Sequence, residues 1–146
     1  PGGWAPRTIK WIRRILKSVS VFLPNAKEAW SITGCRSPVK AAGKLLSYGP
    51  EVVAIKLGPG GCLIADRKEI VKVPGFKCDA FDSTGAGDAF NAGFMLGYLR
   101  GWDFRKMADF ANAAGALTVS SRRKGGDRFP TRKEVEEFLE GKRYDH

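Results

Sequence analysis

Apolar residues along the chain follow two patterns, short unbroken runs and repeats at intervals of three or four. The runs stop at glycine, proline or polar turn residues, and they predict buried strands at residues 19–23, 52–57, 62–65 and 70–73. The repeats predict helices at residues 7–17, 25–33, 38–49, 85–99, 103–119 and 131–139. Because strands alternate with helices, the pattern predicts an α/β fold with a mainly parallel sheet, whose last two strands form a hairpin.

Several of these helices carry start signals, and one of them has an unusual composition. Asn25 precedes a helix that Gly34 ends. Thr131 and Glu134 have the spacing of a capping box, so the last helix should begin there and turn Val135, Phe138 and Leu139 inward. The segment 85–99 is apolar at nearly every position, and we expect that helix to be buried on most of its sides.

Length and composition limit the classes of protein. With 146 residues, 43% of them hydrophobic, the chain has the size of one domain with a core. It has no run of 18 apolar residues and no signal-peptide pattern, so neither a spanning helix nor secretion is expected. Cys35, Cys62 and Cys78 form no Cys-x-x-Cys pair, which indicates reduced thiols in a cytoplasmic protein. The single histidine is His146, the last residue, which argues against Ser-His and Cys-His catalysis.

The formal charge of +10 makes polyanions candidate partners: nucleic acid, an anionic membrane or phosphorylated small molecules. The basic residues are spread over four segments, however, and a solvated surface is the simpler interpretation. Aromatic residues do not alternate with the basic runs, and no nucleic-acid motif is present, so a nucleic-acid binder is disfavoured. The basic segments are residues 7–17, 100–106, 122–124 and 128–133.

Chemistry concentrates in residues 82–90, Asp-Ser-Thr-Gly-Ala-Gly-Asp-Ala-Phe. A Gly-Ala-Gly turn that leads into a helix exposes backbone N–H groups beside the positive end of the helix dipole, so it is a candidate phosphate or oxyanion cradle. Asp88 would place a carboxylate next to that cradle, which is useful if it acts as a general base toward a hydroxyl. The alternative is an ordinary helix start, where acidic residues and closely packed glycines are common.

The same nine residues closely resemble the second signature of the PfkB family of carbohydrate kinases, which have the ribokinase-like fold. Two further segments match that family in the expected order. Residues 23–29, followed by Thr33 and Gly34, resemble its Asn-x-x-Glu motif, and residues 53–61 resemble the strand and loop that lie along the ATP. The resemblance covers residues 1–139, nearly the whole chain.

The resemblance implies a role for each matching residue. Asp88 would be the base that deprotonates the acceptor hydroxyl, while Gly85, Ala86 and Gly87 would form an anion hole for the transferred phosphoryl group. Asn25 would act near the phosphates, and Glu28 would hold Mg²⁺ through water. Their spacing also fits a helix N-cap and its N3 partner, and both roles can coexist.

Further residues would border the nucleotide, namely Lys56, Leu57, Gly58, Gly60, Gly61 and Asn112. For the loop residues the alternative is a plain tight turn, and for Asn112, within an alanine-rich helix, it is a structural hydrogen bond. Many family members also need a monovalent cation such as K⁺, which here would map to Asp82, Thr84, Ser120 and Gly125. The late loop 122–126 has one basic residue more than the family pattern, and a solvated charge run is its alternative.

The 146 residues lack the family's N-terminal glycine-rich signature, sugar-binding strands and lid, and they start without Met. We therefore expect the C-terminal half of a three-layer αβα ribokinase-like domain. Its expected function is transfer of the ATP γ-phosphate to a hydroxyl of a sugar or nucleoside, with negligible activity for this chain alone. The alternative is a non-catalytic nucleotide-binding or assembly module derived from such a kinase. Half of a sheet leaves an open edge and an apolar face, so self-association or a missing N-terminal partner is expected.

Overall fold

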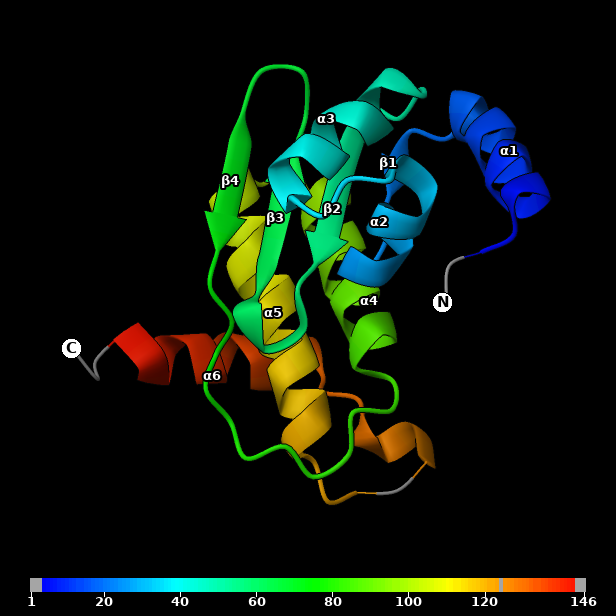
Figure 1. Ribbon diagram of the computed structural model, residues 1–146. Helices are drawn as coiled ribbons and strands as arrows, with labels where there is room; N and C mark the ends of the chain where they lie inside the picture. The colour runs from blue at the N-terminus through cyan, green and yellow to red at the C-terminus, as the bar shows by residue number, and fades with distance from the viewer. Residues whose placement is uncertain (1–3, 124, 144–146) are drawn as a thin grey trace. The chain divides into compact units, whose positions relative to one another are not determined.

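A mixed four-stranded sheet organises the computed structural model, which describes residues 4–123 and 125–143 (Figure 1). The strands follow the spatial order β1-β2-β3-β4, and β1 pairs parallel with β2 whereas β3 pairs antiparallel with β2. The α/β class is confirmed, but the prediction of a mainly parallel sheet is wrong for these strands. The connection from β2 to β3 is only residues 57–61, too short for the crossover that a parallel pair needs. The strands are β1 (Val21–Phe22), β2 (Val52–Lys56), β3 (Cys62–Ala65) and β4 (Ile70–Val73).

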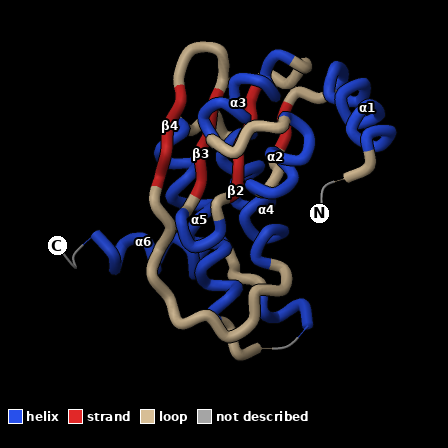
Figure 2. The backbone as a smooth tube through the Cα atoms, in the orientation of Figure 1, coloured by secondary structure: helices blue, strands red, loops and turns tan. Residues whose placement is uncertain are grey.

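Helices form where the apolar repeats predicted them, each within a few residues (Figure 2). The described part of the chain has α1 (Pro6–Ile15), α2 (Ala26–Thr33), α3 (Pro38–Ser47), α4 (Ala86–Leu99), α5 (Phe104–Ser120) and α6 (Arg132–Arg143). Short 3₁₀ turns lie at Leu16–Ser18, Gly58–Gly60 and Gly125–Arg128. None of the helices in residues 4–123 and 125–143 has both the length and the apolar content needed to cross a bilayer.

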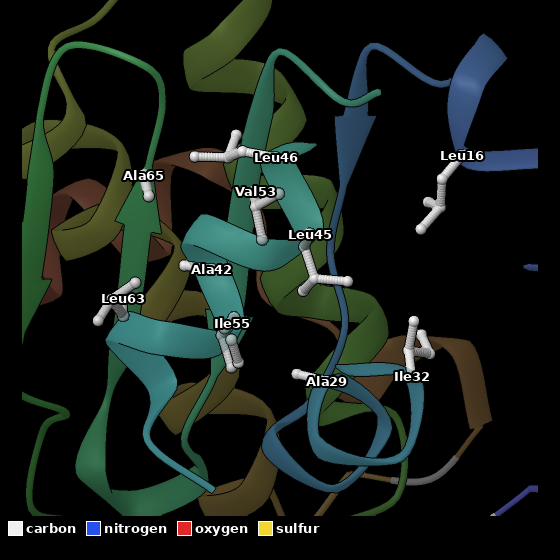
Figure 3. Close-up of a cluster of buried hydrophobic side chains, with 11 residues drawn as sticks. Leu16, Ala29, Ile32, Ala42, Leu45, Leu46, Val53, Ile55, Leu63 and Ala65 are labelled. Carbon is white, nitrogen blue, oxygen red and sulfur yellow. The ribbon is translucent and has the colours of Figure 1, made fainter. Parts of the chain in front are cut away.

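The chain folds into two compact units. The first comprises the described residues of Pro1–Gly58 and Cys62–Lys72, and the second comprises Pro59–Gly61 and those of Val73–His146. In the first unit, α3 packs against β2 and β3, and α2 packs against α3 and β2. Their apolar faces close over the sheet in one buried cluster, which includes Leu16, Ala29, Ile32, Leu45, Val53, Ile55 and Leu63 (Figure 3).

The second unit is built on the close packing of α4 against α5 (Figure 1). Gly93 lies so near α5 that an added Cβ would approach the Cα of Ala111 to 3.2 Å, and a side chain at Gly97 would collide with Met107. The buried residues of α4 are Ala89, Phe90, Gly93, Phe94 and Gly97. They form one stripe, while Leu99 is 78% exposed, so the prediction that this helix is buried on most sides is wrong.

The last helix begins as its sequence predicted. The carboxylate of Glu134 accepts from the Thr131 backbone N–H at 2.7 Å, and the Glu134 N–H donates to the Thr131 hydroxyl at 3.3 Å. Arg123 adds a donor to the same carboxylate at 2.5 Å. Val135 is buried, and Phe138 and Leu139 pack against the same cluster.

These donors predict how stability depends on acid. The Arg123 guanidinium, with help from Thr131, lowers the pKa of Glu134 from its ordinary 4.5 to about 2. Because the folded pKa lies below the unfolded one, this carboxylate stabilises the fold above pH 4.5, and the contribution disappears as pH falls toward 2. We expect the melting temperature of Glu134→Gln to fall less steeply over that range than that of the wild type. Glu137→Gln is the matched control, since Glu137 only faces an exposed lysine at 3.7 Å. Equal slopes for wild type and Glu134→Gln would contradict the assignment.

Candidate functional site

Two of the predicted motifs meet in the first unit, at the ends of the parallel strands β1 and β2. Asn25, beyond the end of β1, forms a parallel bridge with Lys56, the last residue of β2, and the Lys56 backbone N–H donates to the Pro24 carbonyl at 2.9 Å. Ligands of open α/β sheets bind outside the carboxyl ends of the strands. The backbone pairing therefore brings Asn25 and Lys56, which are 31 positions apart, to the kind of edge where a ligand is expected.

Asn25 and Glu28 form the capping box that the sequence allowed. The Asn25 side chain accepts from the Glu28 N–H at 2.8 Å, and the Glu28 carboxylate accepts from the Asn25 N–H at 2.8 Å. This bond uses one carboxylate oxygen, and the other retains acceptor capacity for a water or a hard cation. The residues described contain no cluster of three His, Cys, Asp or Glu that could hold a metal ion. The remaining oxygen of Glu28 is a hard ligand, and it suits Mg²⁺ that keeps its waters and takes further oxygens from a phosphate. The role of Glu28 toward Mg²⁺ stays a prediction.

In the second unit, the start of α4 differs from the starts of α2, α3 and α5. Gly85 has φ of 81° as N-cap, and no side chain caps α4, whereas side-chain oxygens of Asn25, Ser37 and Asp103 cap α2, α3 and α5. The Ala86 N–H donates to the Ser83 carbonyl at 3.2 Å, and the next N–H groups, of Gly87 and Asp88, belong to the first helical turn. Such N–H groups have no intrahelical acceptor, so they remain suited to an anion.

Asp88 lies in the first turn of α4 and is exposed. Asp88 makes no side-chain hydrogen bond or ion pair with another described residue. Because it is in the first turn, its carboxylate belongs to the same helix start as the N–H groups of Gly87 and Asp88, as the sequence predicted. Two predicted features, the donor turn and the carboxylate, are therefore adjacent and accessible in this unit. An arrangement of this kind can bind an anionic group and accept a proton from a hydroxyl next to it.

The turn before α4 is held by a network around Asp82. One carboxylate oxygen accepts from the Thr84 N–H at 2.8 Å, and the backbone N–H groups of Phe81 and Asp82 donate to the Val119 carbonyl at 2.7 and 3.1 Å. The other carboxylate oxygen accepts from Arg128 at 2.8 Å. These donors, the Thr84 N–H first among them, hold the pKa of Asp82 well below its usual range.

The remaining predicted nucleotide residues fall into two groups. Leu57 and Gly58 follow β2 in the first unit, and Gly58 has φ of 58°. Gly60 and Gly61 belong to the second unit, where Gly61 has φ of 87° and lies against the backbone of residues 73–75. This close approach explains why residue 61 is glycine. The role of these loop residues toward a nucleotide stays a prediction.

Asn112 lies in α5 and is only 7% exposed. Its amide donates to the Pro74 carbonyl at 3.2 Å and lies 3.5 Å from the Val73 carbonyl. These contacts are the structural hydrogen bonds that the sequence analysis gave as the alternative for Asn112. A role of Asn112 beside adenine stays a prediction.

For the residues predicted to hold a monovalent cation, the structure gives individual contacts, and their role toward K⁺ stays a prediction. Ser120 donates its hydroxyl to the Ala116 carbonyl at 2.9 Å, and Gly125 begins a 3₁₀ turn. Arg128, at the end of that turn, is the residue that sequence reasoning missed. It is one of several basic residues in the segment, and no spacing signal distinguishes it from Arg122 or Arg123.

Comparison with known proteins gives the family. The profile of the pfkB family carbohydrate kinases matches residues 3–132, most of the chain. The chain belongs to the PfkB family of carbohydrate kinases. The resemblance of the sequence to the PfkB family is thereby confirmed.

Two curated relatives show how much of a kinase the chain represents. It is 38% identical over 116 residues to an uncharacterised sugar kinase of Archaeoglobus fulgidus, and the matched segment covers 80% of this chain and 46% of the relative. It is 36% identical over 132 residues to a ribokinase of Haemophilus influenzae, and the matched segment covers 86% of this chain and 42% of the relative. The chain thus spans less than half the length of these relatives.

A solved PfkB-type structure supports the fold. A candidate ribokinase II of Escherichia coli, in complex with ATP and Mg²⁺, matches with a TM-score of 0.83 and 26% identity. The match covers 93% of this chain and 44% of that protein. The ribokinase-like fold is therefore confirmed for the chain.

Proposed function

We propose that this chain is the C-terminal part of a ribokinase-like kinase domain. In this proposal it binds ATP with Mg²⁺ and directs the γ-phosphoryl group to a hydroxyl of a sugar or nucleoside. The strongest support is the uncapped start of α4, with exposed Asp88 in its first turn. Membership of the PfkB family supports the reaction class, and the likeness to a protein solved with ATP and Mg²⁺ supports the two ligands.

The reaction assigns a separate task to each part of the α4 start. The hydroxyl oxygen of the acceptor attacks the γ-phosphorus, the bond to the β,γ-bridging oxygen breaks, and ADP leaves. Asp88 accepts the hydroxyl proton as the new O–P bond forms, because an alcohol is hardly ionised at neutral pH. Of the predicted anion hole of Gly85, Ala86 and Gly87, the Ala86 N–H is already paired with the Ser83 carbonyl. The N–H groups of Gly87 and of the neighbouring Asp88 therefore donate to the phosphoryl oxygens, on which negative charge is spread in the transition state.

The corner of Asn25, Glu28 and Lys56 would serve the nucleotide. Mg²⁺ supplies charge neutralisation on the phosphate oxygens when it is bound. Glu28 would orient a water toward that ion while it keeps its capping bond to Asn25. Lys56 and the following glycine-rich residues would line the nucleotide, where glycine permits close approach of the backbone.

Positioning of the acceptor supplies much of the rate in phosphoryl transfer, and the curated relatives are more than twice as long as the matched segment. We therefore expect the purified chain to bind ATP weakly and to phosphorylate ribose at a negligible rate. Adding the unmatched portion of the Haemophilus ribokinase should restore ribose-dependent ADP formation in a coupled assay. Ribose phosphorylation by the chain alone at ordinary enzyme rates would contradict this division of labour.

The non-catalytic alternative makes a different prediction for the same assay. An assembly module derived from a kinase has no need of a base at the start of α4, yet Asp88 is present and exposed there. The alternative gains support if the complemented mixture binds ATP but forms no ADP with any sugar or nucleoside.

Self-association of the chain also remains a prediction, and sedimentation of the purified chain as a stable monomer would contradict it.

A further inference from the structure

Arg128 makes a two-pronged contact with Asp82 in the second unit. One guanidinium nitrogen donates to the Asp82 carboxylate at 2.8 Å, and the other donates to the Asp82 backbone carbonyl at 3.1 Å. The Arg128 side chain is 12% exposed, so the pair is shielded from solvent on the arginine side. Its Nε is buried and has no hydrogen-bond partner within the described part of the chain, so the guanidinium depends on Asp82 for its pairing.

These are the oxygen atoms that a monovalent cation at the predicted place would need. K⁺ binds carbonyl, carboxylate and hydroxyl oxygens, and the sequence assigned it to Asp82, Thr84, Ser120 and Gly125. Arg128 already donates to both the carboxylate and the carbonyl of Asp82, and a second positive charge at the same atoms would be repelled. Asp82, paired in this way with Arg128, therefore does not fit K⁺.

The same segment supports the next part of the turn. Phe129, the neighbour of Arg128, packs against Gly85, since an added Cβ on Gly85 would lie 3.0 Å from the Phe129 ring. Residues 128 and 129 thus contact the turn at two points, three positions apart, on either side of Thr84. Asp82 is tied in addition to the end of α5 through the Val119 carbonyl.

We propose that Arg128 is a built-in counter-charge that takes the place of a monovalent cation at Asp82 and holds the turn before α4 in shape. Arg128 is a positioning residue, since it acts through Asp82 and not on a substrate. The consequence for phosphoryl transfer rests on the proposed function: the anion hole of α4 would be ordered in the absence of K⁺.

Melting of the purified chain without nucleotide tests the positioning directly. We expect Arg128→Ala to lower the melting temperature by about 5 °C, because it leaves the turn without its paired charge. Arg105→Ala is the matched control, since Arg105 forms an exposed ion pair with Asp109 at 3.2 Å and should shift the melting temperature by about 1 °C or less. A loss for Arg128→Ala no larger than that of the control would overturn the proposal.

Salt identity tests the replacement of the cation. At matched ionic strength, the wild-type melting temperature and ATP affinity should be the same in KCl and in choline chloride. A rise of about 3 °C or more that is specific to KCl would overturn the proposal. Failure of the proposed function is distinguishable, because it would appear as no ATP binding in either salt while the melting results stand.

Discussion

Replacing Asp88 by Asn is expected to abolish most phosphoryl transfer by the complemented kinase. The amide has nearly the shape of the carboxylate but cannot accept the proton of the attacking hydroxyl, so we expect the rate of ADP formation to fall by about 100-fold or more. Asp88 is exposed in the first turn of α4, so the exchange should leave the fold intact. The measurement is the rate of sugar-dependent ADP formation at saturating ATP.

A measurement of ATP affinity distinguishes loss of the general base from loss of the nucleotide-binding site as the cause of the lower rate. We expect Asp88→Asn to bind ATP at least as well as the wild type, because it removes a negative charge next to the phosphate position. Asp79→Asn is a suitable control, since Asp79 is an exposed aspartate in the loop before the turn. It should keep the wild-type rate. If Asp88→Asn transfers phosphate as fast as that control, Asp88 is not the base.

Gly61→Ala is expected to have the largest effect on stability. A Cβ at residue 61 would overlap the backbone of Val73 and Gly75, and the residue has φ of 87°. Backbone atoms cannot move aside as a flexible side chain can, so overlap and left-handed strain act together. We expect a loss of about 3 kcal/mol or more in the free energy of unfolding, measured by urea denaturation.

Gly58→Ala separates the two causes of that loss. Gly58 also has a positive φ, of 58°, but an added Cβ there meets no atom within 4 Å. Only the left-handed strain should remain, so we expect a loss of about 1 kcal/mol. Equal losses at residues 58 and 61 would contradict the close approach of residue 61 to the segment 73–75.

The elements were predictable because local signals and tertiary packing agree. The Asn25 cap, the hairpin of β3 and β4 and the Thr131–Glu134 box each depend on residues close in sequence. The direction of β3 was missed although the sequence contained it, because the predicted strands 52–57 and 62–65 are too close for the crossover that a parallel pair needs. The stripe on α4 was misjudged for a different reason. Apolar composition does not say which side of a helix finds a partner.

The candidate site was predictable where a motif is contiguous and missed where it depends on folding. The segment 82–90 carries its donors and its carboxylate within nine residues, so the sequence alone located both. The pairing of Arg128 with Asp82 joins positions 46 apart, and neither charge indicates its partner. The hydrogen bond of Asn112 to the Pro74 carbonyl depends on the fold in the same way.

The central claim is that the start of α4 in this chain receives the phosphates of ATP. The most direct measurement is the backbone amide spectrum of the ¹⁵N-labelled chain during titration with ATP and Mg²⁺ to millimolar concentration. We expect saturable shifts of the amides of Gly87 and Asp88, together with those of residues 56–61. Shifts confined to the basic residues of α1, or none at all, would contradict it.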